Sequence, residues 1–143
     1  MVPVNYLAVV VSAVLMMVLG GLWYGPLFGK QWIALVGFDA QKVADMQAKG
    51  MGAMWKSYAF MALGALVMSF VLAHSIIFAN AYLGTSGIAG GLQGGFWNWL
   101  GFMVPVSLGI VLWEGKSWKL WALNAGYYLV GLLIIGTLLS IWV

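Results

Sequence analysis

Four long runs of apolar residues make up most of this 143-residue chain, and they constrain its fold more than any other feature. The runs extend over residues 4–25, 54–79, 95–113 and 118–142. Only 6% of the residues are charged, whereas about a quarter of the residues in a soluble domain carry charge. A helix of about 20 apolar residues spans the hydrocarbon core of a bilayer. The sequence therefore predicts an all-α integral membrane protein, a single domain with four transmembrane helices.

Prolines and glycines interrupt this pattern at defined points. Gly25 and Pro26 end the first run, because proline lacks an amide proton and disfavours helix at the residue before it. Pro105 lies in the middle of the third run, where we expect a kink. Residues 80–94 are rich in glycine and uncharged, and we expect them to form a short external connection.

The segment between the first two runs is the most polar part of the chain. Asp39 is the expected N-cap of a short helix that ends near residue 49. Within residues 39–49, Ala40, Val43 and Met46 recur at helical spacing. This pattern predicts either an amphipathic helix lying on the membrane surface or an ordinary solvated helix.

Lysine placement predicts how the chain is threaded. All six basic residues are lysines, and they occur only between runs one and two, between runs three and four, or within the first three residues of runs two and four. Cytoplasmic loops of membrane proteins are enriched in basic residues. We therefore expect a bacterial inner (cytoplasmic) membrane protein with both termini extracytoplasmic. A nucleic-acid partner is not expected, because no clustered basic face with arginine is present.

Nine tryptophans lie near the predicted ends of the runs. An indole favours the headgroup level, because its ring is apolar and its N–H is polar. The sequence thus predicts two belts of interfacial anchors, although a stacking platform for bases or sugars is an alternative. The inner belt would contain Trp23, Trp32, Trp55, Trp113, Trp118 and Trp121, and the outer belt Trp97, Trp99 and Trp142.

Two short motifs occur twice. Leu-Trp-x-Gly ends the first run at residues 22–25 and the third at 112–115, and Gly-Lys-x-Trp follows at 29–32 and 115–118. This repetition predicts two parallel helical-hairpin repeats, unless every inner boundary simply attracts these residue types. Gly21, Gly25 and Gly29 also have the four-residue spacing that lets membrane helices approach closely.

Four of the polar residues inside the predicted spans are candidate site residues, namely His74, Asn98, Ser107 and Asn124. Intramembrane ionisable residues are costly and are often functional. His74 is therefore a candidate proton-relay group or axial ligand of a haem or pigment. A neutral imidazole hydrogen-bonded between helices is the alternative, and the same explanation serves for the two asparagines.

The sequence lacks the groups that most enzymes need. It has no cysteine, no pair of carboxylates within one run and no nucleophile motif, so we expect no catalytic activity, no cofactor and no metal. The preferred interpretation is a non-enzymatic homo-oligomer or accessory subunit of a larger membrane complex. The alternatives are a small-solute channel or transporter lined by the four polar residues, and pigment or haem binding through His74.

The motifs Asn5-Tyr6-Leu7 and GLWYGPLFGKQW at residues 21–32 resemble the N-terminal signature of a bacterial family catalogued as domain of unknown function 1761. Asn-Ala-Gly-Tyr at residues 124–127 is similar to that family's C-terminal half. The resemblance covers essentially the whole chain. It implies a small multi-span membrane protein and transfers no activity.

The predicted threading can be tested by labelling. A membrane-impermeant amine reagent applied to intact cells should leave Lys42 and Lys49 unmodified, and both should react once the cells are opened, because the positive-inside rule places them in the cytoplasm. Mass spectrometry of the labelled peptides gives the result. Modification of either lysine in intact cells would contradict the threading.

Overall fold

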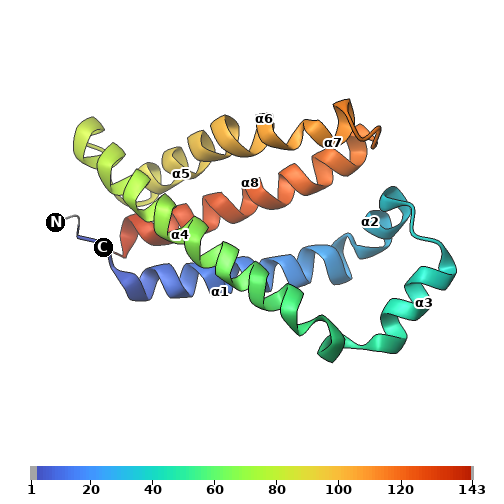
Figure 1. Ribbon diagram of the computed structural model, residues 1–143. Helices are drawn as coiled ribbons and strands as arrows, with labels where there is room; N and C mark the ends of the chain where they lie inside the picture. The colour runs from blue at the N-terminus through green and yellow to red at the C-terminus, as the bar shows by residue number, and fades with distance from the viewer. Residues whose placement is uncertain (1–2, 143) are drawn as a thin grey trace.

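The computed structural model describes residues 3–142, which form a bundle of helices (Figure 1). Four stretches are long and apolar enough to cross a membrane, namely Tyr6–Leu27, Gly52–Leu83, Gly87–Leu112 and Trp118–Ile141. No strand occurs among the described residues. The predicted fold class, an all-α membrane protein with four transmembrane helices, is confirmed.

Short irregular turns divide these stretches. The elements in chain order are α1 (Tyr6–Leu22), the π-helical turn η1 (Trp23–Leu27), α2 (Gly29–Val36), α3 (Ala40–Lys49), the 3-10 turn η2 (Met51–Met54), α4 (Trp55–Leu83), α5 (Gly87–Asn98), the π-helical turn η3 (Trp99–Met103), α6 (Val104–Ser107), α7 (Gly109–Leu112) and α8 (Trp118–Ile141).

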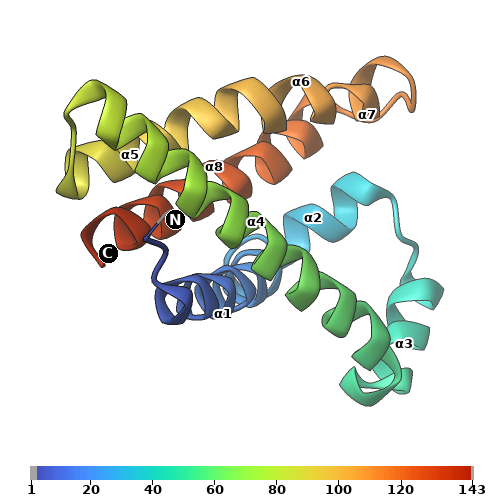
Figure 2. The same ribbon diagram turned by 60° about the vertical axis from the view of Figure 1, so that its left-hand side comes forward.

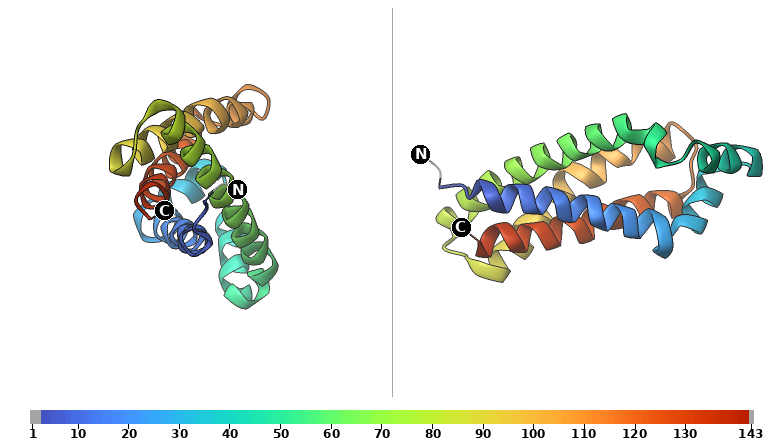
Figure 3. Two further views of the ribbon diagram at one scale, coloured as in Figure 1. Left: turned by 90° about the vertical axis from the view of Figure 1, so that its left-hand side faces the viewer. Right: turned by 90° about the horizontal axis from the view of Figure 1, so that it is seen from below.

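The bundle has one charged end and one uncharged end. The start of α1, the α4–α5 turn and the end of α8 lie together at the uncharged end, whereas α2, α3 and the α7–α8 turn lie at the other (Figures 1 and 3). All the charged side chains belong to segments at this second end, the charged end: Lys30, Asp39, Lys42, Asp45, Lys49, Lys56, Glu114, Lys116 and Lys119.

Side-chain caps begin three of the helices. Asn5 Oδ1 accepts hydrogen bonds from the amides of Leu7 and Ala8 at the start of α1. Asp39 Oδ1 accepts from the Lys42 amide at 2.7 Å, which confirms the predicted N-cap of α3. Ser117 Oγ caps α8 in the same way. Each cap satisfies amides that have no partner within the helix.

The first long helix breaks where the sequence predicts. Gly25 has non-helical dihedral angles (φ −105°, ψ −106°), and Pro26 follows it inside η1. The chain then turns aside at the charged end as α2 (Figures 2 and 3), whose first residue, Gly29, is buried. A Cβ atom at Gly29 would lie 2.7 Å from the Tyr24 carbonyl oxygen. Only glycine therefore allows this tight turn.

The predicted connection at residues 80–94 is wrong in extent. Helix α4 continues to Leu83, where Gly84 ends it with a positive φ of 66°, and α5 already begins at Gly87. Glycine has low helix propensity in isolation, which is why the sequence favoured a loop. In the bundle, the absence of side chains lets α5 lie directly against two neighbouring helices, and this packing outweighs the propensity.

The glycines of α5 form two contact rows. Gly91 and Gly95 face α8, where a Cβ atom at Gly91 would lie 2.5 Å from the Gly136 carbonyl oxygen. Gly90 and Gly94 face α4, against the side chains of Asn80 and Ile76. All four glycines are buried. The two rows make the uncharged end the most tightly packed part of the molecule.

The third long helix is irregular near Pro105, as predicted. The turn η3 has π-helical geometry and directly precedes α6, in whose first turn the proline lies. A proline lacks the amide that a regular helix would require there. A second irregularity at Leu108 separates α6 from α7.

The extended α5 also corrects the position of two tryptophans. Trp97 and Trp99 lie near the middle of the stretch Gly87–Leu112, not at its outer end. Trp97 is 63% exposed on the bundle surface. Trp99 instead packs against the core. Their assignment to an outer belt is therefore wrong, because it depended on the misplaced helix start.

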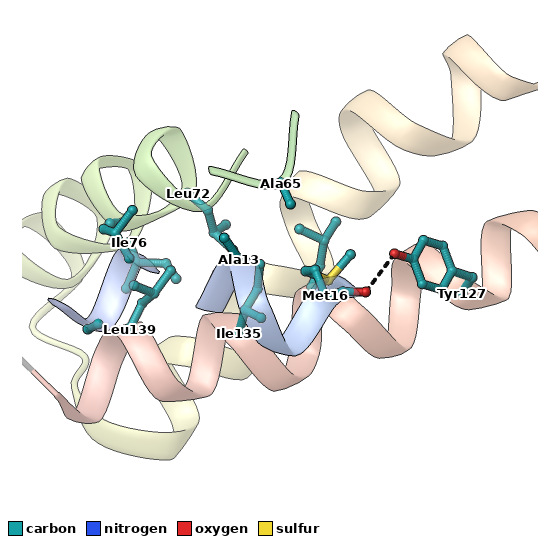
Figure 4. Packing of buried hydrophobic residues seen from close by; sticks show 12 residues of the cluster. Ala13, Met16, Ala65, Leu72, Ile76, Tyr127, Ile135 and Leu139 are labelled. Carbon is teal, nitrogen blue, oxygen red and sulfur yellow. Dashed lines mark hydrogen bonds between the residues drawn. The ribbon is translucent and has the colours of Figure 1, made fainter. Parts of the chain in front are cut away.

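Three of the long helices share one core. Buried side chains of α1, α4 and α8 meet along the bundle axis (Figure 4). Met16, Ile76 and Ile135 are its largest fully buried hydrophobic members. Ser12 and Ser69 are also fully buried.

The helices pair as two hairpins (Figure 2). Helix α1 packs along α4 and α5 packs along α8, while α1 also contacts α8 and α4 contacts α5. This is the arrangement expected of two parallel hairpins. The π-helical turns do not correspond, however, because η1 ends the first stretch and η3 interrupts the third. The duplication stays a prediction.

The glycine packing can be tested with Gly91→Ala. The new methyl group would collide with the backbone of Gly136 and Thr137, and we expect the free energy of unfolding to fall by about 1–3 kcal/mol. Circular dichroism during titration with a denaturing detergent measures it. The matched control is Gly64→Ala, since no atom lies within 4 Å of the added carbon. Equal stability of the two variants would contradict the packing.

Candidate functional site

A cavity of about 670 Å³ lies in the charged half of the bundle and is open to its surface. It is bounded by α1, η1, α2, the beginning of α4, α6, α7 and α8. The lining residues are Met16, Met17, Gly20, Gly21, Tyr24, Gly25, Trp32, Tyr58, Met61, Ser107, Ile110, Asn124, Tyr127 and Tyr128.

The cavity exists because α4 is inclined to the rest of the bundle. Helix α4 packs on α5 and α8, and it crosses α1 toward the charged end, where it diverges from α6 and α7 (Figures 1 and 2). Tyr58 and Met61 of α4 line the resulting cavity, together with Ser107 of α6 and Ile110 of α7. Gly21 on α1 leaves space in the lining, because no atom lies within 4 Å of the position that its Cβ would take.

The lining is aromatic and uncharged. Five aromatic side chains and three methionines contribute to it, whereas the polar groups are the Asn124 amide, the Ser107 hydroxyl and tyrosine hydroxyls. No lining residue is charged. Pockets for small molecules commonly combine a mostly apolar wall with a few fixed polar groups.

Three aromatic donors from other helices hold one short segment of α8. Trp23 Nε1 donates to the Leu123 carbonyl at 3.1 Å, and Trp99 Nε1 donates to the Ala125 carbonyl at 2.8 Å. Between these carbonyls, Asn124 Oδ1 accepts from the Tyr24 hydroxyl at 2.9 Å. We call residues 123–125 the acceptor segment. Two of its donors begin the π-helical turns η1 and η3, so both helix irregularities meet the same segment of α8.

Tyr127 fixes α8 against α1 one turn further along. Its hydroxyl group is buried and donates to the Met16 carbonyl at 3.0 Å (Figure 4). Its ring contacts those of Tyr24 and Tyr128, with centroid distances of 5.3 and 4.9 Å. These rings line the cavity, and hydrogen bonds of Tyr127 to Met16 and of Tyr24 to Asn124 hold them in place.

The predicted polar residues divide between two places. Ser107 and Asn124 both line the cavity, and Ser107 Oγ accepts a hydrogen bond from Trp121 Nε1 at 2.9 Å. Asn98 lines a separate, mainly apolar cavity of about 220 Å³, where its Nδ2 donates to Ser75 Oγ and to the Gly94 carbonyl.

His74 lies outside the cavities described above. Its Nδ1 is 2.8 Å from the Phe70 carbonyl oxygen in the same helix, and its ring contacts the Phe70 ring in a tilted arrangement with the centroids 4.4 Å apart. The His74 side chain therefore bonds within its own helix α4, whereas the sequence predicted a hydrogen bond to another helix. Within residues 3–142, no three His, Asp or Glu side chains cluster as metal ligands would.

The tryptophans of the predicted inner belt have different surroundings. Trp55, Trp113 and Trp118 are exposed at helix ends near the charged end. Trp32 lines the cavity and meets Tyr24 edge to face. At the uncharged end, Trp142 is the C-cap of α8. The indole N–H groups of Trp23 and Trp121, by contrast, bond to protein groups rather than face the headgroups.

Two tyrosines that line the cavity, Tyr127 and Tyr128, are not among the residues predicted from the sequence. They share one helical face with Asn124 by their spacing, and this spacing is the signal that could identify them. Away from the cavity, Asn80 falls within the predicted loop, yet its Nδ2 donates to Ser140 Oγ and its Oδ1 accepts from the Thr85 hydroxyl. These bonds close the bundle at the uncharged end.

The bond between α8 and α1 gives a stability prediction. Tyr127→Phe should lower the free energy of unfolding by about 0.6–1 kcal/mol, the range for one hydrogen bond between membrane helices. Tyr128→Phe is the matched control, because among the described residues its hydroxyl has no hydrogen-bond partner. Detergent titration followed by circular dichroism measures both. A larger loss for Tyr128→Phe would contradict the assigned role.

Comparison with known proteins identifies the family. No curated protein matches the chain, and no solved structure matches it. The family model described as protein of unknown function (DUF1761) matches residues 7–140, which include the four long helices almost completely and every residue that lines the cavity. The chain is a member of the DUF1761 family.

Proposed function

We propose that this protein binds a small, uncharged, lipid-soluble molecule in the cavity of its charged half. The observation that carries the proposal is the cavity itself, at about 670 Å³ and with no charged lining residue. Its volume lies within the range of about 300–1,000 Å³ for small-molecule sites. An ion without a counter-charge would lose hydration there that the lining could not replace.

The access route supports a ligand from the bilayer. The cavity is open to the surface, and the rim residues Tyr58 and Met61 are exposed on α4. In a membrane, this surface of a transmembrane helix faces lipid. A ligand dissolved in the bilayer can therefore enter between α4 and α7 without crossing water.

The proposed setting follows from the lysines. With the charged end in the cytoplasm, the protein lies in the bacterial inner membrane with both termini outside. The cavity is then in the cytoplasmic half of the bilayer. We propose a non-enzymatic binding protein, and its assembly as a homo-oligomer or as an accessory subunit of a larger complex stays a prediction.

The geometry gives less support to the two alternatives. A channel or transporter path lined by His74, Asn98, Asn124 and Ser107 would need these residues to be continuous, whereas only Ser107 and Asn124 share the cavity. A flux assay in liposomes with His74→Ala tests that path. Pigment or haem binding through His74 stays a prediction that an absorption spectrum of the purified protein tests.

Filling the cavity should remove the bound molecule. Gly21→Leu adds a side chain at a residue that lines the cavity, and no atom lies within 4 Å of the new Cβ. We expect the variant to fold, since leucine has higher helix propensity than glycine, and to lose most of the small molecule that co-purifies with the normal protein. Solvent extraction and mass spectrometry, per mole of protein, measure the loss.

The matched control is Gly64→Leu, which makes the same change at another open position on a long helix, away from the cavity. It should retain the molecule. Equal recovery from the two variants, or recovery of none from the normal protein, would refute the proposed site.

A further inference from the structure

We propose that the cavity selects a flat molecule bearing a ring carbonyl, the quinone class of compounds, with the Asn124 amide as the donor that recognises the carbonyl oxygen. The inference rests on the proposed binding function and adds the chemistry of the ligand. Its basis is the hydrogen bonding of Asn124, the shape of the surrounding rings and the distribution of charge.

Asn124 presents a donor that the protein does not use. Its Oδ1 accepts from the Tyr24 hydroxyl, and the Nδ2 group is the other half of the amide. Among the described residues, Asn124 Nδ2 has no acceptor, whereas the Nδ2 of Asn98 donates to two. An amide N–H in an apolar environment is costly without an acceptor. A ligand carbonyl at this position would supply it.

The surrounding side chains favour a flat ring. Tyr24, Tyr127 and Tyr128 form a continuous cluster of rings beside Asn124, with Trp32 in edge contact with Tyr24. Ring edges and faces pack well against another planar π system, and the thioethers of the lining methionines also contact aromatic rings favourably. An acyl chain has neither a flat face nor an acceptor at its end.

The charges argue against ionic ligands. No lining residue is basic, so a carboxylate or phosphate would have no partner inside the cavity. No lining residue is acidic either, and the charged end of the protein carries the whole net charge of +3. That charge disfavours a lipophilic cation, although the aromatic lining alone would attract one. A neutral carbonyl compound needs neither a basic nor an acidic partner in the cavity.

Binding of decylubiquinone tests the inference. The protein is reconstituted in nanodiscs, and the quinone is titrated while tryptophan fluorescence is recorded, because Trp32 lines the cavity and quinones quench indoles. Displacement by decylbenzene, which has no carbonyl, measures the apolar contribution separately. We expect Asn124→Leu to raise the Kd for the quinone about tenfold, the equivalent of one hydrogen bond, and to leave decylbenzene binding unchanged.

Asn98→Leu is the matched control, since it removes the same amide from a site outside the cavity and should leave both affinities unchanged. Unchanged decylbenzene binding also shows that Asn124→Leu is folded. Equal quinone affinity of Asn124→Leu and the normal protein would overturn the inference, as would an absence of quenching or displacement by tetraphenylphosphonium at lower concentration than decylbenzene. In each of these cases the Gly21→Leu comparison still decides independently whether the cavity is a binding site.

Discussion

The structure depends on one constraint, which is that polar groups within a bilayer must find their partners inside the protein. Helices satisfy most of the backbone, and four aromatic side chains make hydrogen bonds between α8 and other helices. The acceptor segment receives Trp23, Tyr24 and Trp99 from two other transmembrane stretches, and Tyr127 returns a bond to α1. These long-range bonds fix the register of the helices in a solvent that gives no hydrophobic driving force for their association.

Packing differs between the uncharged half and the charged half of the bundle. At the uncharged end, the glycines of α5 bring backbone against backbone, and Asn80 and Ser140 close the remaining gap. At the charged end, α4 diverges from α7 (Figure 1), and aromatic side chains line the space between the helices. The same chain therefore contains a closely packed half and an open half that contains the cavity.

The sequence predicted those features that are properties of single segments. Hydrophobic length gave the four helices, and the Asp39 cap and the break at Gly25 followed from local chemistry. Features that arise between segments could not be predicted. Residues 87–95 have the glycine-rich composition of a loop, and their helix is stabilised by contact with α4 and α8. The roles of Trp99 and Asn124 depend on helices that are distant in sequence, and the cavity depends on the inclination of α4.

The central claim, that the open half is a ligand site, is tested most directly by NMR of the methionine methyl groups. Met17 and Met61 line the cavity, whereas Met68 and Met103 line the smaller apolar cavity. With ¹³C-methyl methionine and added decylubiquinone, nuclear Overhauser contacts from the quinone ring should appear at Met17 and Met61. Contacts confined to Met68 and Met103, or shared evenly by all four methyl groups, would contradict the claim.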